Sequence, residues 1–184
     1  MSSSPLSDAL LLCIDVQPAF VNAMADGARI LRRCAFAIEA ATGLGLPVAF
    51  TEQVPQKLGG TAPELLALVA KPVVWGKTAF SALADDGIRD ALRRRGAAHL
   101  ILCGLESPVC IYQTALAALD AGLQVTVLTD AVGARRPDDA QSALAALARA
   151  GVHLIPAETV FYSLLHDAGH PFFKGYTQLV KKYG

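Results

Sequence analysis

Three residues of the sequence carry side chains that together could cleave a carbonyl–nitrogen bond: a carboxylate, an ammonium and a thiol. Asp15 ends the apolar run ALLLCID, Lys77 ends VVWGK, and Cys110 follows the apolar run HLILCGL. A thiolate is a nucleophile, an ammonium favours the thiolate form, and a carboxylate can carry a proton from thiol to leaving amine and then activate water. This chemistry needs no histidine. The residue types therefore predict a cysteine hydrolase centre at Asp15, Lys77 and Cys110.

Each of these residues also has a simpler interpretation. Asp15 could cap the segment that follows it, Lys77 could be an exposed surface lysine, and Cys110 could be a packing residue. The local sequence ESPVC favours chemistry, because Ser107 is suited to the N-cap position of a helix and Pro108 to its first position. We therefore expect Cys110 in a first helical turn, where free N–H groups and the helix dipole favour a thiolate and can stabilise an oxyanion.

The elements that must position these residues alternate along the chain. Short apolar runs predict strands at residues 9–15, 47–52, 72–76, 99–104, 124–129 and 152–156. Longer stretches predict helices at residues 27–44, 62–68, 86–95, 108–121, 138–150, 158–166 and 171–182. Strands joined by helices run parallel, and strands that are apolar on both faces need helices on both sides.

We therefore expect one α/β domain over residues 1–184, a three-layer α/β/α, Rossmann-like, doubly wound sheet of about six parallel strands. In such a sheet the ligand site lies beyond the carboxyl ends of the strands. The residues to inspect there are 15, 51–54, 76–80, 104–110 and 129–135.

Composition disfavours several classes of partner. Sixteen Lys and Arg balance sixteen Asp and Glu, so the formal net charge of +0 disfavours nucleic acid and acidic membrane surfaces. The longest apolar run is far shorter than the roughly 18 residues of a membrane span. Residues 1–5 lack a secretory pattern, and the four cysteines show no CxxC spacing. We expect a cytoplasmic protein with reduced thiols, in which Cys13 and Cys103 are core residues.

No cofactor or metal is expected. The segment after the first strand, DVQPAFV, has no glycine that would let a phosphate approach the backbone. Residues 76–78 read GKT, but Lys71 occupies the position of the first glycine of a phosphate-binding loop. The four histidines are scattered, without the close spacing of a zinc site.

Four motifs, in this order and spacing, resemble the isochorismatase-like cysteine hydrolases: CIDVQ at 13–17 with Phe20, TEQVP at 51–55, KTAFS at 77–81 and GLESPVCI at 104–111. The segment DAGHP at 167–171 is similar to the single-domain subgroup that includes the isochorismatase domain-containing proteins of animals. The resemblance implies a catalytic triad of Asp15, Lys77 and Cys110, a covalent thioester intermediate and a homo-oligomer. It also implies a cis peptide between Leu105 and Glu106, with the backbone N–H groups of Glu106 and Cys110 as the oxyanion hole.

Departures from the family pattern narrow the range of candidate substrates. Its nicotinamidases bind a metal through an Asp and two His after the second strand, but residues 52–57 here read EQVPQK. Some members that cleave isochorismate lack the cysteine, which is present here. Both points favour a small amide-like substrate and no metal. Candidates for the lining of the pocket are Phe20, Val54, Phe80 and Tyr112, although such residues also serve as packing.

Two alternatives remain beside a hydrolase. One is a catalytically silent oligomeric scaffold or ligand-binding module of the same fold. The other is a thiol redox sensor in which Cys110 is oxidised and then resolved by Cys103. The expected helix at 171–182 carries an apolar stripe that is either core or subunit interface.

Overall fold

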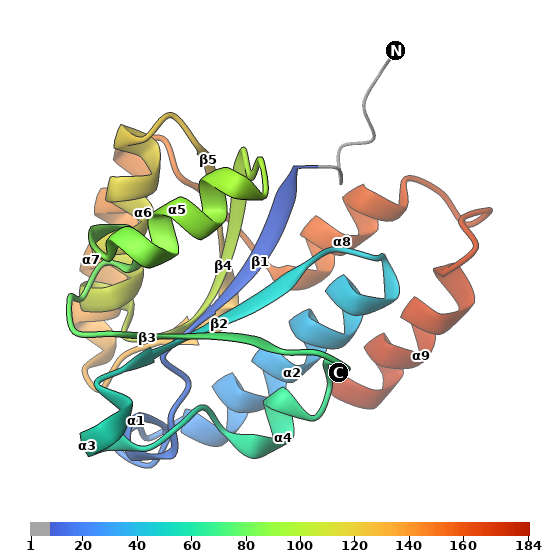
Figure 1. Cartoon of the computed structure of the whole chain (residues 1–184). Coiled ribbons are helices and arrows are strands. Elements are labelled where there is room, and N and C mark those ends of the chain that lie inside the picture. The colour runs from blue at the N-terminus through green and yellow to red at the C-terminus, as the bar shows by residue number, and fades with distance from the viewer. Residues whose placement is uncertain (1–7) are drawn as a thin grey trace.

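The computed structural model describes residues 8–184 as a six-stranded parallel sheet with helices on both faces (Figure 1). The strands are β1 (Ala9–Ile14), β2 (Val48–Gln53), β3 (Val73–Lys77), β4 (His99–Leu105), β5 (Gln124–Gly133) and β6 (His153–Ile155). Their spatial order is β3-β2-β1-β4-β5-β6, and every neighbouring pair is parallel. The predicted fold class and all six strands are confirmed. The segment 1–5, which carried the expectation about a leader, lies outside the described residues.

Two helical layers cover the sheet. One contains α2 (Gly27–Gly43), α4 (Pro63–Leu66), α8 (Ala157–Leu165) and α9 (Phe173–Tyr183). The other contains α5 (Asp86–Arg94), α6 (Tyr112–Asp120) and α7 (Pro137–Arg149). The short helices α1 (Pro18–Val21) and α3 (Pro55–Leu58) and the 3₁₀ turn η1 (Ala82–Ala84) were not predicted, whereas α4, also four residues long, lies within the predicted stretch 62–68.

Strand β1 lies at the centre of the sheet, and its whole length is buried. Successive side chains of a strand point to opposite faces. Accordingly, Leu11 and Cys13 pack with the α2 layer, whereas Leu10 and Leu12 pack with the opposite layer. This explains why the sequence of β1 is continuously apolar instead of alternating.

The apolar stripe of the C-terminal helix is core. Tyr176 of α9 is fully buried, and its ring centroid lies 5.8 Å from that of Phe36 in α2 and 6.4 Å from that of Phe161 in α8. Phe172, Leu179 and other residues of the stripe pack against the same cluster. Helix α9 therefore completes the layer that α2 begins.

Gly104 permits a close approach of β4 to β1 just before the loop that carries Cys110. Its φ is +117°, and a Cβ at this position would lie 2.1 Å from the carbonyl oxygen of Ile14. The register between β4 and β5 also shifts between Leu102 and Gly104. This irregularity sets the path of the chain from the sheet into the candidate site.

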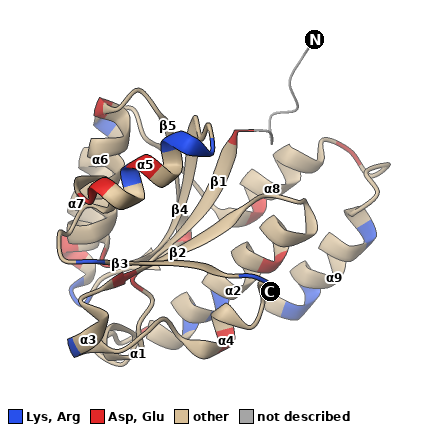
Figure 2. Cartoon of the chain, in the orientation of Figure 1, with Lys and Arg blue, Asp and Glu red and all other residues tan. Residues whose placement is uncertain are grey.

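Acidic and basic residues are interspersed along the helices (Figure 2). Within residues 8–184, no helix combines the length and the apolar character needed to cross a membrane.

Candidate active site

Asp15 and Lys77 form a buried ion pair at the carboxyl edge of the sheet. The Lys77 Nζ donates to Asp15 Oδ2 at 2.7 Å, and the two side chains are 0% and 1% exposed. Nζ also donates to Gln53 Oε1 at 2.6 Å and to the carbonyl oxygen of Ala79 at 3.3 Å. An ammonium has three N–H donors, and each has an acceptor here. The alternative of an exposed surface lysine is therefore wrong.

The carboxylate of Asp15 is fixed from both sides. Its Oδ1 accepts a hydrogen bond from Thr51 Oγ1 at 2.7 Å, and its backbone N–H donates to the carbonyl oxygen of Thr51 at 3.0 Å. Its φ is +52°, a strained value for a residue other than glycine and one that is frequent at functional sites. The residue at the N-cap of α1 is Gln17, so Asp15 does not cap that helix. The structure thus explains the buried carboxylate through the pair with Lys77.

Cys110 lies in the π-helical turn η2 (Ser107–Ile111), which connects β4 to α6, and it is 5% exposed. Burial raises the pKa of its thiol to about 12, and the charge of Asp15 and a hydrogen bond with Asp15 act in the same direction. Lys77 and the backbone of Glu106 lower the pKa, but by less. The expectation of a resting thiolate is therefore wrong: desolvation outweighs the cationic surroundings. The three predicted groups nevertheless lie together, with a protonated thiol beside a carboxylate.

The start of this turn also differs from the prediction. Glu106 precedes the turn without a side-chain cap, and Ser107 is its first residue. The Ser107 hydroxyl is buried and has no partner among the described residues. Ser107 is thus not the N-cap, because the turn begins one residue earlier than the sequence indicated. The peptide bond between Leu105 and Glu106 is cis.

Glu106 also borders a cavity of about 400 Å³ beside the turn. Its lining comes from η2 and from the chain after β5: Glu106, Pro108, Val109, Arg135, Arg136 and Asp139. The Arg135 guanidinium donates to the nearly buried Glu106 carboxylate, while the Arg135 side chain itself is 65% exposed. Arg135 ends one of the segments that the sequence marked for inspection, but its partner was not foreseen.

The four predicted pocket residues do not meet in that cavity. Phe20 is half-buried against the core cluster on the α2 side, and Phe80 is 52% exposed. Val54 is half-buried, and its φ of +41° is unusual for a β-branched residue. Tyr112 lines a neighbouring groove of about 350 Å³ together with Pro108 and Asp139. Substrate contact by these four residues stays a prediction.

Sequence reasoning missed the amides that hold Lys77. Gln53 accepts from Lys77, and its own Nε2 donates to the carbonyl oxygen of Thr78 at 2.7 Å. Gln17 accepts from the Gln53 backbone N–H at 2.7 Å and donates to the carbonyl oxygens of Gln53 and Gly59. One signal of their role is present in the sequence: Gln17 and Gln53 lie near strand ends, within the motifs CIDVQ and TEQVP that resemble the family.

The parallel sheet, with an acid, a lysine and a thiol at its carboxyl edge, defines a three-layer α/β protein whose candidate site lies beyond the strand ends. The chain belongs to the isochorismatase domain family: the model of the Isochorismatase domain matches residues 9–159. This confirms the resemblance seen in the motifs, and the fold is that of isochorismatase-like hydrolases.

Known relatives match nearly the whole chain. Isochorismatase domain-containing protein 2 of Pongo abelii is 38% identical over 97% of this chain and 85% of its own length. A solved structure of MAR1 ribonuclease from Caenorhabditis elegans has a TM-score of 0.90 and 31% identity, with 96% of this chain and 91% of that chain covered. The Escherichia coli YcaC protein, described as an octameric hydrolase of unknown specificity, shares the fold at a TM-score of 0.83 and 23% identity, with 96% and 94% covered.

Proposed function

We propose that the chain is a metal-independent cysteine hydrolase that cleaves the C–N bond of a small amide-like substrate through a thioester on Cys110. The observation that carries this proposal is the placement of Asp15. Its carboxylate is paired with the buried Lys77, and its charge and hydrogen bonding raise the pKa of the nearby Cys110 thiol. A buried acid next to a protonated thiol is suited to general base catalysis.

The first chemical step forms the thioester. Asp15 takes the S–H proton as the Cys110 sulfur attacks the substrate carbonyl carbon, and the carbonyl π electrons move to oxygen. The backbone N–H groups of Glu106 and Cys110 stabilise this oxyanion. The intermediate then collapses, the C–N bond breaks, and Asp15 gives its proton to the leaving amine.

The second step releases the acid product. Asp15 takes a proton from water as the water oxygen attacks the thioester carbon. The C–S bond breaks, and the proton returns to the Cys110 sulfur. Lys77 stays charged throughout and keeps the Asp15 carboxylate in place, because its three N–H groups are fixed by Asp15, Gln53 and the Ala79 carbonyl.

A ribonuclease is the second candidate. The solved relative from C. elegans is named a ribonuclease, and two arginines, Arg135 and Arg136, line the cavity beside η2. The balanced net charge argues for a small substrate instead, because RNA binding draws strongly on cationic surface. Cleavage of RNA is therefore an outcome that the experiment must distinguish.

The test is a panel of small amides, assayed for release of ammonia or amine, with single-stranded RNA assayed in parallel. Cys110→Ala is expected to lower amide turnover at least about a thousandfold, since loss of a nucleophile removes the whole covalent route. Asp15→Asn should act similarly, while the matched exposed variant Asp120→Asn should keep wild-type turnover. Mass spectrometry should show an acyl adduct on Cys110 during turnover.

Amide turnover that survives Cys110→Ala would refute the mechanism. RNA cleavage without amide turnover would favour the ribonuclease. A folded protein with no turnover and no adduct across the panel would favour the silent scaffold or ligand-binding module.

We also infer that residues 1–184 act as one domain in a cytoplasmic homo-oligomer. The octameric YcaC relative and the half-exposed Phe80 support association. Light scattering at micromolar concentration should give a multiple of the chain mass; a monomer would contradict the inference.

A further inference from the structure

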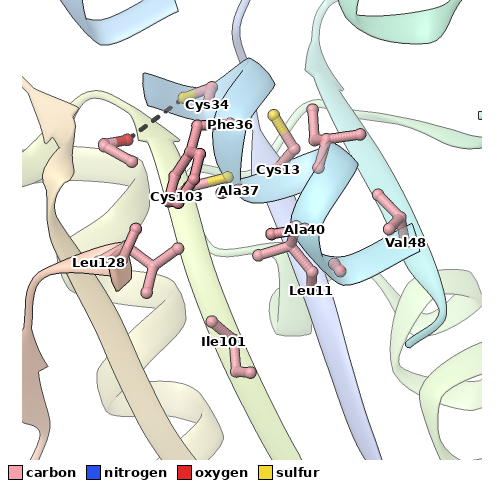
Figure 3. Packing of buried hydrophobic residues seen from close by; sticks show 14 of the residues in the cluster. Leu11, Cys13, Cys34, Phe36, Ala37, Ala40, Val48, Ile101, Cys103 and Leu128 are labelled. Atoms are coloured by element: carbon pink, nitrogen blue, oxygen red, sulfur yellow. Dashed lines mark hydrogen bonds between the residues drawn. The ribbon is translucent and has the colours of Figure 1, made fainter. Parts of the chain in front are cut away.

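Three of the four cysteines meet in the core, away from Cys110. Cys13 comes from β1, Cys34 from α2 and Cys103 from β4, and their sulfur atoms lie within 4.8 Å of one another (Figure 3). The three residues are 1%, 0% and 0% exposed, and none forms a disulfide. Cys13 and Cys103 are direct partners in the β1–β4 ladder, so the two sulfurs leave the sheet on the same face, beneath α2.

The spacing of the sulfurs is close to that of a three-coordinate metal site. Three atoms no more than 4.8 Å apart leave a central point no more than 4.8 Å/√3 from each, about 2.8 Å, against about 2.3 Å for a zinc–thiolate bond. An inward shift of about half an ångström per sulfur would close this difference. Small rotations of three short side chains can supply such a shift without moving the strands.

The sulfur atoms of the cluster are largely free to turn toward a common ion. The Cys34 thiol donates a hydrogen bond to the carbonyl oxygen of Ala131 at 3.3 Å. Metal ions bind the thiolate form of cysteine, so uptake of an ion would release the protons of the ligating thiols. The positive charge of the ion would offset part of the thiolate charge inside the core.

We propose that Cys13, Cys34 and Cys103 bind one Cu(I) ion in a trigonal three-sulfur site. Soft sulfur ligands select Cu(I), zinc or iron–sulfur clusters among common metals. Structural zinc takes four ligands, and within residues 8–184 no His, Cys, Asp or Glu joins the three cysteines as a fourth. Of these soft metals, Cu(I) therefore fits the three-sulfur donor set best.

This site is independent of the proposed hydrolase. It lies on the α2 face of the sheet, whereas Cys110 packs with the opposite layer. A bound ion would tie β1, β4 and α2 together, and a ligand that binds only the folded state raises its stability. The site would therefore act on the fold, not as a reactant in hydrolysis.

The experiment is an anaerobic titration of the full chain with Cu(I) against the competing chelator bicinchoninate. Because the thiols are buried, readings are followed until constant, and a parallel sample receives Cu(I) while it refolds from urea. Wild type and Cys110→Ala, which removes the one cysteine outside the cluster, should each bind one Cu(I) per chain. Cys34→Ala should bind at least about 100-fold more weakly, since loss of even an outer-shell partner costs 10- to 100-fold.

X-ray absorption on the loaded wild type keeps the test decisive if Cys34→Ala does not fold. It should show three sulfur neighbours at about 2.3 Å. Equal affinity of folded Cys34→Ala and wild type, loss of binding in Cys110→Ala, no uptake by either route, or coordination by nitrogen or oxygen would each overturn the proposal.

Discussion

Replacing Lys77 with methionine should strongly destabilise the fold, because it removes one partner of a buried ion pair. Methionine has a similar length but no charge, so the volume change is small. The substitution deletes hydrogen bonds to Asp15 Oδ2 (2.7 Å), Gln53 Oε1 (2.6 Å) and the Ala79 carbonyl (3.3 Å). It leaves the Asp15 carboxylate, whose side chain is 1% exposed, with the Thr51 hydroxyl and the weakly donating Cys110 thiol as its side-chain donors among the residues that the structure describes.

The expected cost is about 3–5 kcal/mol of the free energy of unfolding at pH 7, the range for an orphaned partner of a buried pair. Part of that cost is the uncompensated charge of Asp15. A second substitution, Asp15→Asn, removes the charge and tolerates the positive φ. In the Asp15→Asn background, Lys77→Met should therefore cost about 1–3 kcal/mol less than it does in wild type, which gives the coupling energy of the pair.

Urea unfolding, followed by circular dichroism, measures both numbers, with an unchanged m-value as the check that the denatured state is unaltered. Lys71→Met is the matched control; Lys71 is exposed, and its loss should change stability by no more than about 0.5 kcal/mol. A cost below about 1 kcal/mol for Lys77→Met would refute the reasoning, because a pair worth so little is typical of a solvated surface position.

Three further predictions follow from the same structure. Burial and Asp15 raise the pKa of Cys110 to about 12, so the rate of its alkylation by iodoacetamide should rise about tenfold per pH unit from pH 7 to 10. At pH 8 the rate should be higher in Asp15→Asn than in wild type. A rate that reaches a plateau below pH 9, measured by peptide mass spectrometry, would contradict this prediction. Gly104→Ala should lower the free energy of unfolding, measured by thermal unfolding, by more than about 3 kcal/mol, because the new Cβ would lie 2.1 Å from the Ile14 carbonyl oxygen at a φ of +117°. A variant that melts at the wild-type temperature would show that the backbone at Gly104 does not have this conformation. Phe36→Ala should lower the free energy of unfolding in urea by about 3–5 kcal/mol, because it leaves a cavity in the core. A loss under about 1 kcal/mol would mean that α2 and α9 do not pack together around Phe36.

The strands were predictable because each is a short apolar run bounded by turn residues. The boundaries were less so, and β5 shows why. It continues to Gly133, four residues past the predicted end, through the polar Asp130. Asp130 is tolerated in the strand because its carboxylate accepts from Arg33 of α2 and from the backbone N–H of Ala157. Both partners are distant in sequence, so no local pattern announces them.

The same limit applies to the candidate site. That Asp15, Lys77 and Cys110 would meet follows from their positions at the ends of parallel strands. The protonation of Cys110 could not be predicted in the same way. A position in a first helical turn indicates the effect of the helix dipole on the thiol pKa, but it does not reveal the burial that raises this pKa. Nor did the partnership of Lys77 with Gln53, which depends on the register of β2 against β3.

The order of the strands in the sheet determines which cysteines become neighbours, and this order is the feature that the sequence reveals least. The chain builds β1, β2 and β3 outward and then returns to place β4 beside β1. That return makes Cys13 and Cys103 neighbours although 90 positions separate them, and it turns both toward α2 and Cys34. Cys110, seven residues after Cys103, belongs to the opposite layer. A redox sensor that resolves Cys110 with Cys103 would therefore have to pass a sulfur through the sheet, so the structure argues against it and leaves two separate thiol environments, one beside an acid and one closed within the core.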